Sequence, residues 1–281
     1  MIHIGMDPDL FSFGGFVFSW HGFLSFVAVS MAVYLVARWA PREKIHPDVV
    51  YSTAVWAIVG GIVGARLVHV IDQWEFYGEN PGQIVALWNG GIAIYGAILG
   101  GLAGGVAYAY IQKCPIGKLA DLAAPAILLA QAFGRIGDII NGEHVGKLTT
   151  MPWGFVWSNL KSPTFQKYGL ASTHPAVVYE MLWDILAFFI LWKYLRGRLK
   201  PDGMLFAAYL AIYSFGRFFI SFFREDRLWL AGMSQAQIIA LLVMAVTIPL
   251  LMYKARFVVR EEAGARAGQP GAQGPKPKRA R

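Results

Sequence analysis

The feature that most constrains this chain is a series of apolar stretches, each close to the length of a helix that crosses a lipid bilayer. Charged residues are absent from the first, third and last of these stretches. The sequence therefore predicts an all-α, polytopic membrane protein with a single transmembrane domain over residues 1–253. We expect about seven spans, at about 16–37, 49–71, 91–112, 119–140, 175–192, 204–223 and 234–253.

The overall composition agrees with a membrane protein. Hydrophobic residues make up 56% of the chain and charged residues 15%, whereas a soluble domain carries about 25% charged residues. The single cysteine, Cys114, excludes an internal disulfide framework and a cysteine-based zinc site. A soluble enzyme is therefore disfavoured.

The basic residues predict the orientation of the chain, because cytoplasmic loops are enriched in Lys and Arg. With the N-terminus outside, the cytoplasmic segments 38–48, 112–118, 193–203 and 254–281 hold 3, 2, 4 and 8 of the 25 basic residues. The net charge of +8 is then a topology signal, and we expect no nucleic-acid partner. Segment 254–281 is predicted to be a basic, disordered cytoplasmic tail, since its later part lacks large apolar residues.

Two further patterns concern the loops and the packing of the helices. The outside loop 141–174 contains Trp153 and Trp157, and such aromatic side chains fit either a lid at the lipid headgroups or plain interfacial anchors. Gly96, Gly100 and Gly104 have the four-residue spacing that lets two helix backbones approach closely. We interpret them as helix-packing residues.

Several ionisable residues lie within the predicted spans, where they are costly and tend to mark function. By position along the spans, Arg66, Arg135 and Arg217 fall at a similar depth towards the outside. Three guanidinium groups with few nearby acids predict a net positive pocket for an anionic lipid headgroup. The alternative is a set of structural ion pairs between helices. The residues concerned are Arg66, His69, Arg135, Asp138, Glu180, Asp184 and Arg217.

The densest group of polar and glycine residues is segment 133–146, at the end of the fourth predicted span. It holds four glycines, an arginine, two acids, an asparagine and a histidine. We expect the span to unwind here into a turn that lines a cavity, because irregular backbone at membrane depth is tolerated only in such places. An ordinary helix C-terminus with a glycine cap is the alternative.

The same segment resembles a family signature of the form G-R-[LI]-G-N-F-[IL]-N-G-E-x-x-G, and other stretches match in the same order. The chain is similar to the bacterial phosphatidylglycerol–prolipoprotein diacylglyceryl transferases over roughly residues 16–253. The matching stretches are Trp20-His21-Gly22, Gly64-Ala65-Arg66, Trp88–Gly96, Gly134–Gly146, His174–Glu180, and Arg217 with Phe222-Phe223-Arg224.

Four positions depart from the pattern of that family. Tyr95 stands where a histidine is usual and His21 where a tyrosine is usual, while Asp138 replaces an asparagine and Ser221 a glutamate. The first two departures form a reciprocal exchange. We hypothesise that His21 and Tyr95 face one pocket, so that the imidazole has moved from one wall to another.

The resemblance implies a reaction. The diacylglyceryl group of phosphatidylglycerol moves to the cysteine thiol of a lipobox in a prolipoprotein, which gives a thioether and glycerol phosphate. The location implied is the bacterial cytoplasmic membrane. We expect no cofactor and no metal. A lipid-pocket relative with another acceptor, or a lipid-binding or transport protein without chemistry, remain the alternatives.

The resemblance also suggests roles for individual residues. Arg135 is the first candidate to bind the phosphate and Arg217 the second, with Arg66 in support. For the base, His21 is favoured because an unperturbed imidazole titrates near neutral pH. Glu143 is the second choice, and Tyr95 would donate to the phosphate or glycerol. Further predicted contacts to phosphatidylglycerol come from Asp138, Asn141, Gly142 and Gly146.

Overall fold

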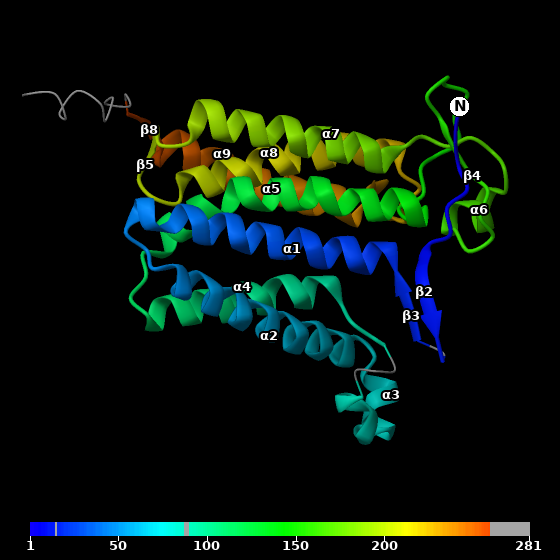
Figure 1. The fold of residues 1–281 in the computed structure, drawn as a ribbon, viewed down its shortest axis with the longest axis horizontal. Coiled ribbons are helices and arrows are strands. Elements are labelled where there is room, and N and C mark those ends of the chain that lie inside the picture. Colours follow the sequence, from blue (N-terminus) through cyan, green and yellow to red (C-terminus); the bar gives the residue numbers. More distant parts are fainter. Residues whose placement is uncertain (15, 87–89, 259–281) are drawn as a thin grey trace, which may run out of the picture.

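The computed structural model describes residues 1–14, 16–86 and 90–258. Predictions for residues 88 and 89 of the Trp88–Gly96 motif and for residues 259–281 of the tail lie outside this range. Long helices dominate, as the sequence predicts, and they lie side by side as a bundle (Figure 1). They are α1 (Trp20–Trp39), α2 (Pro47–Asp72), α4 (Ile94–Ile111), α5 (Ile116–Asn141), α7 (Ala176–Phe189), α8 (Met204–Ile220) and α9 (Gln235–Lys254).

Shorter elements lie at the two ends of this bundle (Figure 1). The short helices are α3 (Trp74–Glu79) and α6 (Pro163–Tyr168), with 3₁₀ segments Ala40–Glu43, Pro81–Val85 and Ser221–Phe223. The strands are β1 (Ile2–Ile4), β2 (Asp9–Phe13), β3 (Phe16–Ser19), β4 (Phe155–Trp157), β5 (Leu199–Lys200), β6 (Leu228–Leu230), β7 (Met233–Ser234) and β8 (Arg256–Phe257). They pair as β1–β4, β2–β3, β5–β8 and β6–β7; only β1–β4 is parallel.

Six helices of the described chain are long and apolar enough to cross a membrane: α1, α2, α4, α5, α8 and α9. The predicted fifth span corresponds to α7, which has 14 residues and runs directly into a π-helical segment, Ile190–Leu195. Large apolar side chains such as Phe26, Ile98 and Val246 are exposed on the helix surfaces, as expected where lipid is the surrounding medium. The polytopic all-α prediction is confirmed, while the count of seven spans and the orientation stay predictions.

Two boundaries differ from those predicted. Residues 16–19 are not helical, because Phe16–Ser19 pairs with Asp9–Phe13 in an antiparallel hairpin. Ser19 then accepts a hydrogen bond from the Gly22 amide at 3.1 Å and caps α1. At the other end, the first residues of the predicted tail have regular structure: α9 extends through Lys254, and Arg256–Phe257 pairs with β5.

Helix α5 is the centre of the fold. One buried cluster joins it to α7 and α8 through residues such as Leu128, Ala187 and Leu205. A second cluster joins it to α1 and the start of α2 through Leu122, Val36 and others. A helix held from both sides is a rigid support for the polar residues near its C-terminus.

Candidate active site

The C-terminal end of α5 lies against the first turn of α1, and a glycine allows this close approach. A Cβ on Gly137 would lie 2.8 Å from the Cα of His21, closer than side chains pack. The neighbouring residue, Asp138, is thereby brought within reach of the imidazole. Its Oδ1 lies 2.6 Å from His21 Nδ1, the distance of a short charge-assisted hydrogen bond.

The second oxygen of Asp138 faces two other groups. Arg135, one turn earlier on α5, donates to Oδ2 at 2.9 Å. The Nε2 of His144, just beyond the helix, lies 3.6 Å from the same oxygen. One buried carboxylate thus connects a histidine of α1 with a histidine of the loop after α5.

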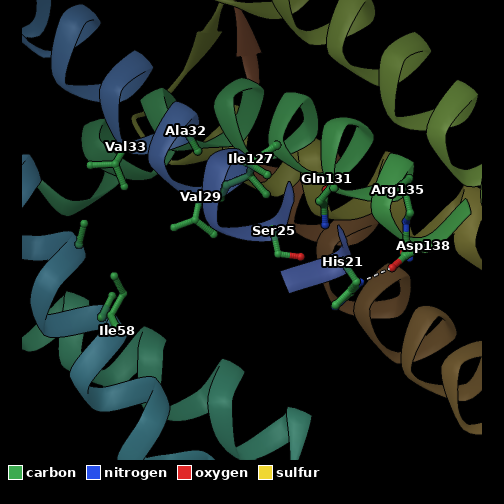
Figure 2. Close-up of a pocket in the computed structure, with 15 residues that line it drawn as sticks. His21, Ser25, Val29, Ala32, Val33, Ile58, Ile127, Gln131, Arg135 and Asp138 are labelled. Atoms are coloured by element: carbon green, nitrogen blue, oxygen red, sulfur yellow. Dashed lines mark hydrogen bonds and ion pairs between the residues drawn. The ribbon is translucent and has the colours of Figure 1, made fainter. Parts of the chain in front are cut away.

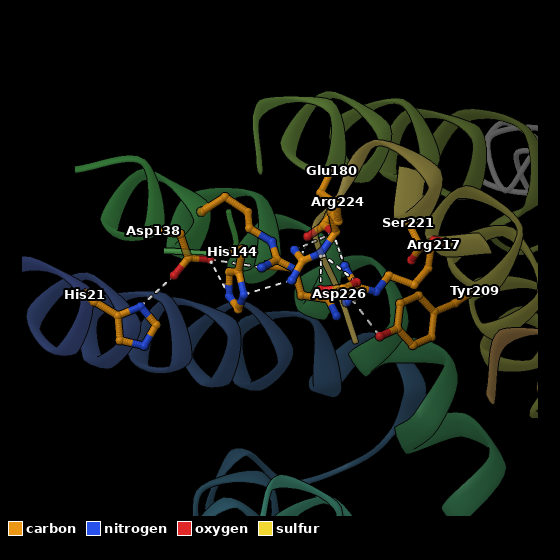
Figure 3. Close-up of polar contacts among 11 residues, drawn as sticks. His21, Asp138, His144, Glu180, Tyr209, Arg217, Ser221, Arg224 and Asp226 are labelled. Atoms are coloured by element: carbon orange, nitrogen blue, oxygen red, sulfur yellow. Dashed lines mark hydrogen bonds and ion pairs between the residues drawn. The ribbon is translucent and has the colours of Figure 1, made fainter. Parts of the chain in front are cut away.

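Glu180 on α7 is the second centre of the polar network (Figure 3). Its Oε2 lies 2.6 Å from Arg135 Nη2, and its Oε1 pairs with Arg217 and with Arg224, the latter at 3.1 Å. Arg224 is itself buried and also contacts Asp226, with Nε to Oδ2 at 3.1 Å. The guanidinium groups therefore converge on carboxylates.

This pairing corrects the prediction of a net positive pocket. Three arginines face three carboxylates in the network: Arg135, Arg217, Arg224, Asp138, Glu180 and Asp226. An unpaired buried charge is too costly to keep. Asp138 and Asp226 are sequence neighbours of the arginines they pair with, and the fold brings the distant Glu180 to all three arginines. Arg217 forms an ion pair between helices, as in the alternative interpretation, and does not line the cavity described next, so its role at the phosphate stays a prediction.

A cavity of about 530 Å³ lies between α1, α2 and α5 and reaches this network at one end (Figure 2). His21, Gln131, Arg135 and Asp138 gather at that end, with Ser25 close by. The remaining lining is apolar and includes Ala28, Val29, Ala32, Val33, Ala54, Ala57, Ile58 and Ile127. The space is therefore charged at one end and hydrocarbon-like along the rest.

Arg66 belongs to a different part of the molecule. Its five N–H groups have five acceptors, all of them backbone carbonyls of the loop after α3. Among them, Nε donates to Ile84 at 2.8 Å and Nη1 donates to Gly90 at 2.6 Å and to Gly91 at 2.8 Å. In this structure the loop carbonyls occupy its donors, and the predicted support of a phosphate by Arg66 stays a prediction.

Tyr95 also lies away from the cavity. It is the second residue of α4, is partly exposed, and is not among the cavity-lining residues. The structure thus does not bring His21 and Tyr95 to one pocket, and the imidazole of His21 pairs with Asp138 instead. Asp138, which pairs with His21, is itself one of the four positions that depart from the family pattern.

The end of α5 is regular, which corrects the prediction that it unwinds. The helix runs through Asn141 and ends on Gly142, whose φ of 69° is the left-handed conformation of a glycine cap. A Cβ on Gly142 would overlap Ser162, and one on Gly146 would overlap the backbone of His174. Both glycines pack against protein rather than against the cavity.

Two other predicted residues lie beside His21. Glu143 Oε2 is 3.9 Å from His21 Nδ1, and Glu143 Oε1 accepts from the Asn141 amide at 3.0 Å. Neither Glu143 nor Asn141 lines the cavity. Their positions suit support of the His21–Asp138 pair more directly than contact with a lipid.

Arg224 and His144 are not among the site residues that the sequence predicts. Arg224 was visible as the last residue of a matching motif, but its burial could not be read from the sequence. For His144, only its place between glycines was a signal. Burial and the charge of Arg224 hold the pKa of His144 below its ordinary value, which favours the neutral ring.

A multi-pass membrane protein with a cavity of this kind can hold a lipid by its chains and its headgroup at once. The comparisons with known proteins agree with that class. Residues 8–253 match the prolipoprotein diacylglyceryl transferase family. The chain therefore belongs to this family.

Several relatives carry the name phosphatidylglycerol–prolipoprotein diacylglyceryl transferase. The protein of Trichormus variabilis is 37% identical over 241 residues, which cover 83% of this chain and 84% of the relative. The protein of Listeria innocua is 36% identical over 253 residues, which cover 89% of this chain and 90% of the relative. The protein of Thermosynechococcus vestitus is 36% identical over 227 residues, which cover 80% of this chain and 84% of the relative.

Proposed function

We infer that this chain transfers the diacylglyceryl group of phosphatidylglycerol to the lipobox cysteine of a prolipoprotein, in the cytoplasmic membrane of a bacterium. Membership of the family supports this reaction. The observation that carries it is the cavity, whose apolar walls end at His21, Arg135 and Asp138. A diacyl lipid would place its chains between α1 and α2 and its phosphate at the charged end.

The thiol must lose a proton to become a good nucleophile. We assign this proton to Nε2 of His21. Its Nδ1 faces Asp138 Oδ1 at 2.6 Å, so that nitrogen carries the hydrogen, and the lone pair at Nε2 is left to accept the thiol proton. The Asp138 carboxylate would then stabilise the imidazolium that forms.

The leaving group needs a positive charge that stabilises the negative charge developing on the phosphate. As the sulfur bonds to the glycerol carbon, the bond from that carbon to the phosphate oxygen breaks, and its electron pair leaves with glycerol phosphate. We assign the stabilisation of this charge to Arg135, which lines the cavity. Each of its terminal nitrogens carries two N–H groups and makes one ion pair here, so Arg135 has donors for phosphate oxygens.

The test is a direct transfer assay with purified protein in detergent. Phosphatidylglycerol and a synthetic lipobox peptide are supplied, and the peptide mass is followed. We expect a gain of one diacylglyceryl group, no gain with Arg135→Lys, and a normal gain with Arg42→Lys. Arg42 is exposed near the opposite end of the bundle and controls for the exchange itself.

The outcomes separate the proposed reaction from its alternatives. No mass gain with the unchanged chain, although phosphatidylglycerol binds, would reject transfer to a lipobox and favour another acceptor or a lipid-binding role. An equal gain with both substitutions would show that Arg135 does not stabilise the leaving phosphate.

A further inference from the structure

His144 occupies a position between the two carboxylate centres of the network (Figure 3). It lies in the turn after α5 with a φ of 57°, a conformation that few residues other than glycine, asparagine, aspartate and histidine adopt readily. The chain beside it is held by backbone hydrogen bonds from Glu225 to Val145 at 2.9 Å and from Lys147 to Phe223 at 2.9 Å. The ring is thereby fixed between Asp138 and Arg224.

The partners of His144 determine which of its nitrogens carries the proton. Arg224 Nη2 lies 3.0 Å from His144 Nδ1, and a guanidinium can only donate. Nδ1 must therefore accept, and a neutral ring carries its hydrogen on Nε2. That nitrogen faces Asp138 Oδ2 at 3.6 Å, an electrostatic contact rather than a hydrogen bond.

The surrounding charges favour the same neutral form. Arg224 and Arg135 are the cations near the ring, and Asp138 and Glu180 are the acids. Burial and the guanidinium of Arg224 lower the pKa of His144. A proton on Nδ1 would point at the guanidinium of Arg224 and remove its acceptor.

This arrangement leaves the two oxygens of Asp138 with different partners. Arg135 and His144 face Oδ2, and only His21 among these three faces Oδ1. We propose that His144 is a positioning residue, which connects Arg224 to Asp138 and, through that carboxylate, holds His21 with Nε2 directed to substrate. This role rests on the proposed transfer reaction, but its geometric basis can be measured separately.

The first test is the tautomer of His144, which does not depend on activity. Full-length protein in detergent, carrying isotope-labelled histidine, is observed by NMR at neutral pH, and His144→Asn identifies the signal by its loss. We expect a neutral ring with the hydrogen on Nε2. A charged ring, or a hydrogen on Nδ1, would overturn the proposal even if the transfer reaction is correct.

The second test is kinetic and uses His144→Asn, a conservative variant. Asparagine tolerates the left-handed backbone and retains an acceptor near the place of Nδ1, but it lacks the group at Nε2. We expect kcat to fall about tenfold, less than the ~10²- to 10⁴-fold loss for a group that itself transfers the proton. KM for phosphatidylglycerol and for the peptide should stay near the values of the unchanged chain.

The control is His174→Asn. His174 lies in the same loop but contacts Tyr179 rather than the network, with Nδ1 to the hydroxyl at 3.3 Å. This variant should retain kcat. Equal losses in the two variants, or a loss confined to KM, would show that His144 only supports the loop. If the unchanged chain transfers nothing, the proposed function fails, while the NMR result still decides the arrangement of His144.

Discussion

Two helix pairs in this protein are held together by different means. Helices α2 and α4 contact through bare backbone, since a Cβ on Gly64 or Gly100 would overlap the main chain of the opposite helix. Helices α1 and α5 also approach closely, at Gly137, but there a side-chain hydrogen bond between His21 and Asp138 connects them as well. Small residues give close packing in lipid, whereas polar groups are kept where they serve a site.

The arginines of the two pairs show the same contrast. On α2, Arg66 gives its N–H groups to loop carbonyls, so it orders a loop. On α5, Arg135 forms ion pairs with Asp138 and Glu180 and lines a cavity. An arginine inside a membrane protein therefore indicates chemistry only when its partners and its access to a cavity are known.

The largest effect is expected at the α1–α5 contact. His21→Gln retains a polar side chain on the helix but removes the base, so transfer should fall by ~10²- to 10⁴-fold. The measurement is the initial rate of diacylglyceryl gain on a lipobox peptide. The matched control is His46→Gln at the opposite end of the bundle, and a loss no greater than that of the control would remove His21 from the mechanism.

The next largest effect is expected when one methyl group is added to a glycine of each helix pair, α2–α4 and α1–α5. In Gly100→Ala the new Cβ overlaps the Gly60 carbonyl, and such overpacking costs about 1–3 kcal/mol. In Gly134→Ala on α5 the nearest atom is the Ala28 Cβ at 3.9 Å, an ordinary contact, and helix propensity favours alanine by up to about 1 kcal/mol. Thermal unfolding in detergent should show a lower midpoint for the first variant only. Equal midpoints would contradict the close backbone packing of α2 and α4.

A comparable but more local effect is expected at Arg66. In Arg66→Gln most of the donors to the loop carbonyls are lost, and a buried unsatisfied group costs about 1–3 kcal/mol. Hydrogen exchange should increase at residues 83–86 and 90–91, and transfer should fall less than in Arg135→Lys. If transfer falls as far and the loop stays protected, Arg66 contacts the phosphate after all.

These comparisons also show what could be predicted from the sequence. Apolar length places the helices, and glycine spacing identifies the packing face around Gly100, because both depend on local pattern. Arg135 and Asp138 indicated the candidate site, since charges in a span are rare. The division of roles between Arg66 and Arg135 was not predictable, because it depends on which carbonyls and carboxylates the folded chain brings to each.

The final prediction concerns how the stability of the fold depends on pH through His144 of the network. The pKa of His144 is lower in the folded state than its ordinary value of 6.5, mainly because of burial and then because of Arg224. The unfolded chain therefore binds a proton that the folded chain resists, and this contribution lowers the stability of the fold as the pH falls through that range. The effect is the smallest of the set, since 37% of the side chain is exposed and solvent screens it.

Unfolding midpoints between about pH 5 and about pH 7 should decline less steeply in His144→Asn than in the unchanged chain. Parallel curves would show that the ring titrates as freely in the folded protein as in the unfolded one, and that Arg224 and burial do not keep it neutral.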